Sequence, residues 1–319
     1  MELSAYPPKH LKLLIIKPSS LGDIIQMLQV VEGAYHAAKA KQIHLEIHWI
    51  VRDCFADFLQ LSPYVSKIFI FKRNQGITGF KQLMQEVRHF HYDWIIDGQG
   101  LFRSGLMTFF AHGNHKIGRK DARECSRIFY QKTYAPIQKQ AHAVEILNAL
   151  FTPLALESFP QIPLSLKLPN WHFPFNKDAI LLFPNSRGPH KEWPYFYELT
   201  IALLEKTNHY YIWIGQQTPS HVPTHPRFIN FFGKTQLSDL PLLIKEARCI
   251  IANDSGPIHL AAALKKPLVG IYGPTDGLRY GPYPTQSHCI LQAPNNNLKN
   301  LSIEAVTSAL LQQLKNASL

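Results

Sequence analysis

The sequence contains no continuous apolar run of about 18 residues, the length that a membrane-spanning helix requires. Its first apolar stretch, four residues between Lys12 and Lys17, is too short for the core of a signal peptide. No predicted strand is followed by the GxGxxG motif of dinucleotide-binding enzymes, which argues against a dehydrogenase. We therefore expect a cytoplasmic protein without membrane-spanning helices.

Cysteine is scarce, and no CxxC pair or Cys/His spacing suggests a zinc site or a disulfide framework. We expect the cysteines to be buried free thiols; they are Cys54, Cys125, Cys249 and Cys289. Hydrophobic residues make up 46% of the chain and charged residues 17%, as in globular proteins. A chain of 319 residues is long enough for two domains, each with its own core.

Acidic residues are outnumbered by basic ones, 22 to 33, which gives a formal net charge of +11. The excess is concentrated in residues 98–140, which contain eight Lys and Arg residues but only two acidic ones. Such a segment can bind a phosphorylated substrate, an anionic membrane surface or nucleic acid, or can be an ordinary solvated surface. A nucleic-acid-binding protein is the weaker alternative, because the regular stripe of basic and stacking aromatic residues is missing.

Short runs rich in β-branched and aromatic residues alternate with helical patterns along the whole chain, which predicts an α/β fold built from parallel βαβ units. Strands are expected at 12–17, 43–51, 67–72, 93–97, 179–184, 210–215, 227–232, 248–253, 267–272 and 288–292. Helices are expected near 23–39, 53–60, 78–90 and 301–315. Residues 152–177 contain five prolines and no sustained period, as in an interdomain linker. We therefore place the domains at 1–170 and 171–319, with the last helix packing on one of them.

The first predicted strand ends in a turn with the sequence KPSSLGD, residues 17–23. Ligands of open parallel sheets bind beyond the carboxyl ends of the strands, so this turn is a candidate site. A carboxylate there is suited to removing the proton of a sugar hydroxyl that attacks an anomeric carbon, which makes Asp23 the candidate base. Ser and Asp are also common helix caps, and a purely structural turn remains the alternative.

A second motif, NDSGPIHL at 253–260, follows a strand and opens an apolar helix that Ser255 would cap. The free amides and the dipole of a helix amino terminus attract the pyrophosphate of a sugar nucleotide. Asp254 directly precedes this position and could hold sugar hydroxyls. His259 lies about one turn inside the helix, where a packing role is the alternative.

A third motif, PNSRGPHKEWP at 184–194, is a polar loop after a strand. Arg187 and Lys191 could neutralise a diphosphate leaving group or could lie in solvent. Each motif is a weak signal by itself. Their shared position after strands, in both halves of the chain, is a stronger one.

Together these motifs resemble the bacterial heptosyltransferases of glycosyltransferase family 9, from Leu13 to about Tyr283. The family's opening loop resembles LIIKPSSLGDII, and its nucleotide-sugar signature resembles NDSGPIHLAAALKKPLVGIYGPTD. Segments of the type that adds the first heptose to the lipopolysaccharide core resemble IIDGQGLFRSGLMTFFAHG, RECSRIFY and QAHAVEIL. The resemblance implies a GT-B fold, with two Rossmann-like lobes facing a central cleft. The amino-terminal lobe would bind the acceptor and the carboxyl-terminal lobe ADP-heptose.

The resemblance further implies metal-independent, cofactor-free, inverting transfer of L-glycero-D-manno-heptose from ADP-heptose to a Kdo residue of Kdo-lipid A. The enzyme would lie peripherally on the anionic cytoplasmic face of the inner membrane and would not bind nucleic acid. The catalytic base of the family falls on Asp23. The donor-binding positions fall on Ser186, Arg187, Lys191, Gln217, Thr235, Asp254, Ser255, Gly256 and His259. The acceptor-binding candidates are Ser19, Ser20, Gly22, Arg103, Arg119, Lys120 and Arg123.

Two donor positions depart from the family pattern. Ser255 stands where the family usually has Thr, a change that keeps the hydroxyl. Gln217 stands where a glutamate usually contacts the ribose, so a charged hydrogen bond becomes a neutral one and the nucleotide preference is open. The alternatives are therefore a GT-B epimerase, a transferase of another nucleotide sugar, or a catalytically silent member of the family.

Overall fold

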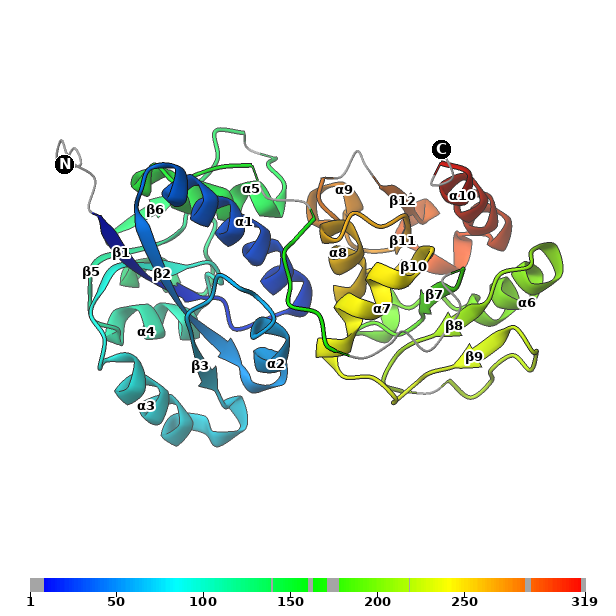
Figure 1. Ribbon diagram of the computed structural model, residues 1–319, viewed down its shortest axis with the longest axis horizontal. Helices are drawn as coiled ribbons and strands as arrows, with labels where there is room; N and C mark the ends of the chain where they lie inside the picture. Colours follow the sequence, from blue (N-terminus) through cyan, green and yellow to red (C-terminus); the bar gives the residue numbers. More distant parts are fainter. Residues whose placement is uncertain are drawn as a thin grey trace. The chain divides into compact units, whose positions relative to one another are not determined.

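A computed structural model of the chain describes residues 9–138, 140–159, 163–170, 178–217, 219–284 and 288–316. The chain divides after Lys167 into two compact units, Met1–Lys167 and Leu168–Leu319, against the predicted boundary at 170. Each unit is built on one six-stranded, all-parallel sheet with helices on both faces (Figure 1). Among the described residues, no helix combines the length and the apolarity needed to cross a membrane.

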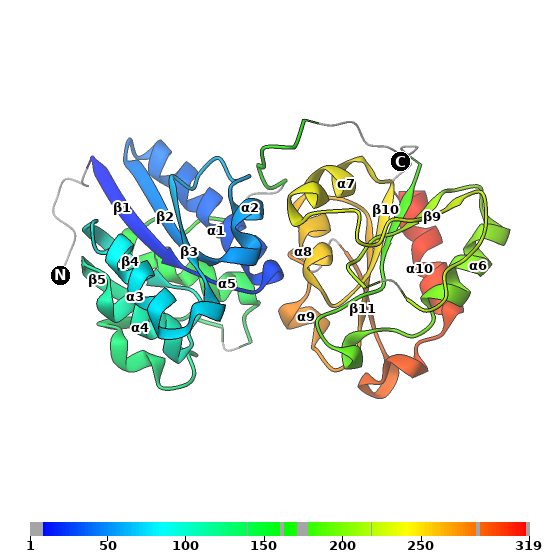
Figure 2. The ribbon, with the colours of Figure 1, turned by 90° about the horizontal axis from the view of Figure 1, so that it is seen from below.

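The first sheet has the strand order β3-β2-β1-β4-β5-β6. Its strands are β1 (His10–Ile16), β2 (His44–Arg52), β3 (Lys67–Phe71), β4 (Tyr92–Asp97), β5 (Gly113–Arg119) and β6 (Lys132–Tyr134). Its helices are α1 (Leu21–Ala40), α2 (Ala56–Leu59), α3 (Gly76–Val87), α4 (Phe102–Phe110) and α5 (Ala143–Asn148), with the 3-10 turns η3 (Ser126–Phe129) and η4 (Ala149–Leu154) among the shorter elements. Figure 2 shows α3 and α4 as neighbours in this unit.

The second sheet has the strand order β12-β11-β10-β7-β8-β9. Its strands are β7 (Ile180–Phe183), β8 (Tyr211–Trp213), β9 (Phe228–Asn230), β10 (Cys249–Asn253), β11 (Leu268–Tyr272) and β12 (Cys289–Gln292). Its helices are α6 (Phe196–Lys206), α7 (Leu240–Glu246), α8 (Gly256–Ala263), α9 (Gly277–Tyr280) and α10 (Ile303–Asn316). Helix α10 packs on β10, β11, β12 and α6, so the closing helix covers the sheet of its own unit.

Both sheets share one topology. When the strands are numbered within each unit and the second sheet is read from β9 to β12, both orders are third, second, first, fourth, fifth, sixth. The first and fourth strands are therefore neighbours, and the chain leaves them toward opposite sides of the sheet. Every residue of Leu13–Ile16 in β1 is fully buried, which fits a strand covered by helices on both faces. The α/β fold class predicted from the alternating pattern is confirmed.

The sequence patterns gave no range for two strands, β5 and β6, or for the helices α4, α5, α6, α7 and α9. β5 has the sequence GNHKIGR and β6 has KTY, and neither contains the apolar run that marks a buried strand. Helix α4 precedes these strands in the same basic segment. The helix predicted over 53–60 is a 3-10 turn at Asp53–Phe55 followed by the single turn α2.

The predicted linker at 152–177 is largely part of the first unit. Leu154, Leu156 and Leu164 are buried. Ser165 donates hydrogen bonds from its N–H and its hydroxyl to the buried Glu32 carboxylate on α1, at 3.0 and 2.6 Å. The N–H of Lys167 donates to Leu61 O at 2.8 Å. Residues 160–162 and 171–177 lie outside the described residues.

The four cysteines are free, as predicted, but their predicted burial is only partly right. Cys249 is buried in β10 and Cys289 is half-buried in β12, whereas Cys54 and Cys125 are exposed. Both exposed residues lie in short turns, where an apolar side chain has no sheet or helix to cover it.

Candidate active site

The turn after β1 holds a carboxylate between an ammonium group and a serine. Lys17 Nζ donates to Asp23 Oδ1 at 3.0 Å, and Ser20 donates to Asp23 Oδ2 from its N–H at 3.0 Å and from its hydroxyl at 2.5 Å. The indole N–H of Trp49 on β2 fixes the turn by donating to Lys17 O at 3.1 Å. Asp23 therefore supports the start of α1 as well as forming a candidate site, so both alternatives raised by the sequence apply to it.

The two members of this ion pair differ in exposure. The Lys17 side chain is 1% exposed and that of Asp23 is 41% exposed. Burial opposes ionisation of Asp23, but the Lys17 ammonium and the hydrogen bonds from Ser20 outweigh it and hold the carboxyl pKa well below its usual value. Burial lowers the pKa of Lys17, and Asp23 partly offsets this effect. The pair presents an ionised carboxylate to solvent.

The turn after β4 supports this site from the neighbouring strand. The side chain of Gln99 accepts a hydrogen bond from the N–H of Ser19 at 3.3 Å. Asp97 is fully buried and accepts hydrogen bonds from the N–H groups of Gln99 and Gly100 and from the hydroxyl of Tyr130, at 2.8 to 3.0 Å. Burial raises the pKa of Asp97 although these hydrogen bonds oppose the rise. Asp97 thus fixes the loop rather than facing a substrate.

Arg119, the last residue of β5, adds a positive charge at the carboxyl end of its strand. Arg119 donates two hydrogen bonds to Asp121, at 2.9 and 2.7 Å, and its side chain is 19% exposed. Burial lowers the pKa of Arg119, but Asp121, Asp23 and Asp97 together outweigh burial and raise it. Because Arg119 also contributes to lowering the Lys17 pKa, its charge lies close to the turn that carries Asp23.

The acceptor-binding candidates divide into two groups. Ser19, Ser20, Gly22 and Arg119 are brought together around Asp23. The other candidates are exposed: Lys120 and Arg123 lie on the loop after β5, whose Arg123 N–H donates to Gly100 O at 2.9 Å, and Arg103 on α4 lies over the ring of Phe71 at 5.7 Å. Lys139 of the basic segment lies outside the described residues.

In the second unit the motif at 184–194 is tied to the end of β10 by one buried amide. Asn253 donates from Nδ2 to Pro184 O at 2.6 Å and accepts at Oδ1 from the N–H of Trp193 at 3.0 Å. Ser186 donates from its hydroxyl to Asp254 O at 2.9 Å, and its N–H donates to Glu192 Oε1 at 2.8 Å. These hydrogen bonds place the loop beside the start of α8.

The same loop carries the second lysine–aspartate pair, in which Lys191 Nζ lies 2.5 Å from Asp254 Oδ2. Here the lysine side chain is 30% exposed and the aspartate 12%. Ser255 occupies the N-cap position of α8, but its hydroxyl donates to Asn253 O at 3.1 Å instead of capping the helix, which corrects the sequence prediction. The first turn from Gly256 is thus not capped by Ser255, and His259 is buried within that turn.

The remaining donor candidates lie on exposed or half-buried loops. Arg187 is exposed in the loop after β7. The loops after β8 and β9 are joined by a hydrogen bond from Gly233 N–H to Gly215 O at 2.9 Å, and Gly233 has a φ of 68° that favours glycine. Gln217 is exposed on the first of these loops and Thr235 half-buried on the second.

Sequence reasoning overlooked the roles of Lys17, Gln99 and Asn253. Each lay inside a motif that the sequence analysis quoted, at or just after the end of a predicted strand, which was the available signal. Among the residues that the structure describes, no group of three His, Cys, Asp or Glu side chains is arranged to hold a metal ion. The candidate ligand-binding atoms are carboxylates, ammonium groups, hydroxyls and backbone amides.

Comparisons with known proteins agree on one family. A family model described as glycosyltransferase family 9 (heptosyltransferase) matches residues 80–310. Lipopolysaccharide heptosyltransferase 1 of Escherichia coli K12 is 28% identical over 330 aligned positions, covering 94% of this chain and 99% of the relative. Lipopolysaccharide heptosyltransferase 2 of Salmonella typhimurium is 24% identical and covers 83% of each chain. The solved structure of E. coli heptosyltransferase WaaC with ADP-2-deoxy-2-fluoro heptose is 25% identical, with a TM-score of 0.76 over 95% of this chain and 99% of that one.

Proposed function

The chain belongs to glycosyltransferase family 9, and on this premise we propose that it transfers a heptose from ADP-heptose to the lipopolysaccharide core. Relatives that align with most of the chain are named as lipopolysaccharide heptosyltransferases, and a similar solved structure holds an ADP-heptose analogue. The finer proposal is inverting transfer of L-glycero-D-manno-heptose to a Kdo residue of Kdo-lipid A. The observation that carries it is the ionised, partly exposed carboxylate of Asp23 in the first turn of α1, which follows β1.

In this proposal, Asp23 acts as the general base. Hydrogen bonds from described residues occupy Oδ2 twice and Oδ1 once, which leaves a lone pair on Oδ1 for the acceptor hydroxyl. The hydroxyl oxygen attacks the anomeric carbon of the heptose, its proton passes to Asp23, and the bond from that carbon to the β-phosphate oxygen breaks. A single displacement from the opposite face inverts the anomeric configuration. Because Asp23 is already ionised at neutral pH, its contribution is position rather than an adjusted pKa.

The departing ADP would be bound by the second unit. Lys191 carries a partly exposed ammonium group next to the start of α8, which suits the negative charge that develops on the β-phosphate. Asp254 would hold heptose hydroxyls, and Ser186, Arg187, Gln217, Thr235, Ser255, Gly256 and His259 would line the rest of the donor site. We propose that these groups suffice without a metal ion or cofactor, so that EDTA leaves turnover unchanged.

The acceptor would be bound by the first unit, where Arg119 provides a cation beside Asp23 and Arg103, Lys120 and Arg123 are exposed. These cations suit the carboxylate of Kdo and the phosphates of lipid A. We further propose a cytoplasmic enzyme, peripheral on the inner membrane. Relatives include both heptosyltransferase 1 and heptosyltransferase 2, so the acceptor must be tested with and without a first heptose.

The deciding experiment measures ADP release by the purified protein with ADP-heptose, with and without deacylated Kdo-lipid A. Acceptor-dependent release that disappears in Asp23→Asn supports the reaction and the base. Turnover only with an acceptor that already carries a heptose would replace the Kdo acceptor by a heptose acceptor. Donor binding without turnover on either acceptor would reject the proposed acceptors.

The second candidate is a GT-B enzyme that uses another nucleotide sugar. The observation that favours it is the neutral, exposed Gln217 at the position where the family usually has a glutamate. A donor screen with ADP-, GDP- and UDP-sugars separates the two proposals, since only one predicts ADP-heptose as the preferred donor.

A further inference from the structure

Helices α3 and α4 and the turn η3 carry a connected row of phenylalanine rings in the first unit. Phe80 contacts Phe110 with ring centroids 6.1 Å apart, Phe110 contacts Phe109 at 5.2 Å, Phe109 contacts Phe129 at 5.9 Å, and Phe129 contacts Phe102 at 5.5 Å. We call these five residues the phenylalanine face. The neighbouring positions of α3 and α4 can be followed in Figures 1 and 2.

Three of the five rings of the phenylalanine face are exposed, and Phe80 and Phe129 are half-buried. Phe102, Phe109 and Phe110 are 44%, 56% and 40% exposed, and Ile128 in η3 is 73% exposed. Single exposed apolar residues are ordinary in proteins, whereas a contiguous exposed patch marks an interaction surface. The described part of the second unit exposes large apolar side chains only singly or in pairs, on α6, α9 and α10.

Local packing holds the face in place. Helix α4 buries Ser104, Met107 and Thr108 against its own unit, which leaves its phenylalanines on the outer side. Gly105 lets η3 approach, because a Cβ there would lie 2.5 Å from the ring of Phe129. The exposed rings are therefore attached to a packed helix rather than to a loose loop.

Basic residues contact one of these rings or share a helix or turn with them. Lys116 Nζ lies 5.8 Å from the Phe109 ring centroid and donates to Phe109 O at 2.6 Å. Burial and the nearby cation of Arg88 lower the pKa of Lys116, which means that two positive charges lie close together here. Arg103 on α4 and Arg127 in η3 are exposed. The nearby acid Glu124 accepts a hydrogen bond from Phe102 N–H at 3.1 Å, at the amino terminus of α4.

We propose that the phenylalanine face and its basic residues dock the first unit onto an anionic phospholipid bilayer. The rings enter the headgroup region, where exposed apolar surface leaves water, and Lys116, Arg103 and Arg127 meet lipid phosphates. The charges favour an anionic bilayer as the partner. Such a bilayer has negatively charged headgroups at its surface for the cations and an apolar interior for the aromatic rings. The inference rests on the peripheral location proposed above and names the surface responsible.

The position of the face fits catalysis at a membrane. Helix α4 begins directly after the turn of Gln99 and Gly100, and Gln99 contacts Ser19 in the turn that carries Asp23. The loop of Arg123 is hydrogen-bonded to Gly100 in the same place. A bilayer docked along the length of α4 would reach the carboxyl edge of the first sheet, where a lipid-anchored acceptor has to arrive, at Phe102, while Phe109 and Phe110 lie at the other end of the helix.

The first test measures co-sedimentation of the full chain with vesicles of phosphatidylglycerol and phosphatidylethanolamine, and with vesicles of phosphatidylcholine alone. The wild type should bind the anionic vesicles at least tenfold more tightly, and Phe109→Ser with Phe110→Ser should lose at least tenfold of that affinity. Leu311→Ser is the control, since it removes a leucine of similar exposure from α10 in the other unit. Unchanged binding by the double variant, or no binding by the wild type, overturns the proposal.

A second variant guards against misfolding as the cause of lost binding. In Phe109→Trp, the new indole should be quenched by brominated phosphatidylglycerol beyond the quenching of the five native tryptophans in the wild type. Lys116→Gln with Arg127→Gln should weaken anionic binding and leave binding to phosphatidylcholine as it was. The proposal is rejected if Phe109→Trp shows no quenching beyond that of the wild type. It is also rejected if the wild type forms a dimer that the double phenylalanine variant abolishes and neither protein binds vesicles, since the face would then bind a second copy of the chain.

Failure of docking and failure of the proposed reaction remain distinguishable. Vesicle binding needs neither donor nor acceptor, so it is measured independently of activity. With a water-soluble deacylated acceptor, Phe109→Ser with Phe110→Ser should keep the wild-type kcat. A loss of turnover on that acceptor contradicts a role of the face in docking alone.

Discussion

Each unit places a lysine–aspartate ion pair at the end of its central strands, and the two pairs are exposed in opposite senses. In the first unit the lysine is buried and the aspartate is 41% exposed, whereas in the second the aspartate is 12% exposed and the lysine 30%. The partly exposed member is the one that a substrate can reach. In the proposed reaction, the same two residue types would offer a carboxylate to a hydroxyl in one unit and an ammonium group to a phosphate in the other.

The largest expected effect comes from breaking the first pair at its exposed member. Asp23→Asn should lower kcat by about 10³-fold with little change in ADP-heptose affinity, since loss of a positioned general base costs roughly 10²- to 10⁴-fold. Steady-state kinetics and a donor-binding titration measure the two quantities. Asp57→Asn, an exposed aspartate on α2, is the control. Weaker donor binding at normal kcat would remove Asp23 from the role of base.

Breaking the second pair at its exposed member should act on the donor. Lys191→Met should weaken ADP-heptose binding by about 10- to 100-fold, because a hydrogen bond to a charged group contributes roughly 1.5–3 kcal/mol. Isothermal titration with ADP and with ADP-heptose gives the affinities. Equal affinity in Lys191→Met and wild type would show that the exposed lysine does not face the phosphates.

The pH profile sharpens the comparison, because only the first pair affects the proposed base. Lys17→Met removes the cation that holds the Asp23 pKa down, so that pKa should rise. The acidic limb of kcat/KM should move upward by about 1–3 pH units, the usual effect of an adjacent opposite charge. Rates between pH 3 and pH 8 test this, because the wild-type limb lies below that range and the limb of Lys17→Met should enter it. A limb that stays in place would mean that Asp23 is not the group that titrates.

The aspartate substitution should be the more destabilising one in the first unit, and the lysine substitution in the second. Asp23→Asn leaves the buried Lys17 ammonium without its partner and should cost roughly 2–3 kcal/mol of unfolding free energy, whereas Lys17→Met leaves a solvated carboxylate and should cost under about 1 kcal/mol. In the second unit, Lys191→Met should be the more destabilising change and Asp254→Asn the milder one. Denaturant titration of all four variants tests the reversal. The same order in both units would contradict it.

The smallest effect separates two serines that stand before helices. Ser20→Ala removes a hydrogen bond to the Asp23 carboxylate and should lower stability by about 1–2 kcal/mol, while Ser255→Ala removes one to a neutral carbonyl and should lower it by about 0.5 kcal/mol. Thermal unfolding of the two variants gives the difference. A larger loss in Ser255→Ala would indicate that its hydroxyl caps α8 after all.

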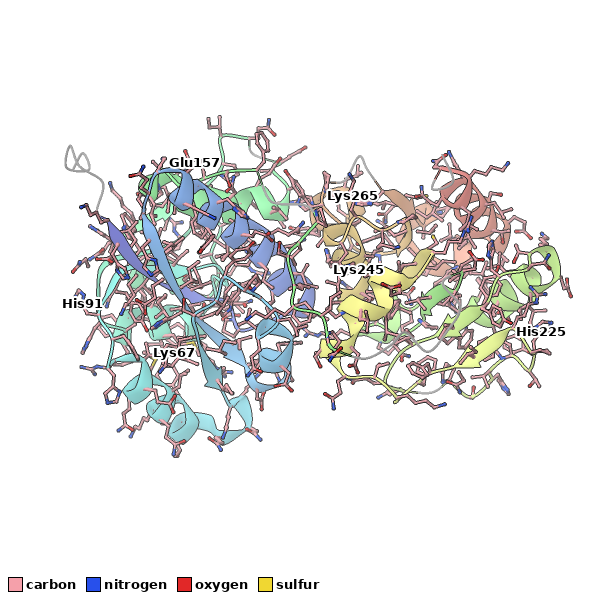
Figure 3. The ribbon with its side chains drawn as sticks, viewed as in Figure 1. Lys67, His91, Glu157, His225, Lys245 and Lys265 are labelled. Atoms are coloured by element: carbon pink, nitrogen blue, oxygen red, sulfur yellow. The ribbon has the colours of Figure 1, made fainter. Side chains whose placement is uncertain are left out.

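Much of the fold followed from local pattern, because ten of the strands are apolar runs that any parallel sheet requires. β5 and β6 were not predicted, since mixed strands such as KTY acquire their conformation from their neighbour in the sheet. Asp23, Lys191 and Asp254 could be predicted as candidates from the sequence because turns after strands are where ligands bind in open parallel sheets. The burial of Lys17 was not predictable: a lysine ending a strand resembles a solvated flank until Trp49 and Asp23 are known to contact it. At the opposite end of the sheet, Lys67, labelled in Figure 3, begins β3. Its ammonium group lies over the ring of Phe90, and the sequence does not show this contact either.

The shared strand order has a consequence for evolution. The two ion pairs of the candidate site stand on turns that follow the first strand of the first unit and the first and fourth strands of the second, other candidates such as Gln217 stand on the turns after neighbouring strands, and the strands themselves supply the buried core. Replacing one turn can therefore alter donor or acceptor preference without repacking either interior. A lineage with this architecture can diversify its sugars one turn at a time, and a single glutamine at position 217 in place of a glutamate is the kind of step by which it would do so.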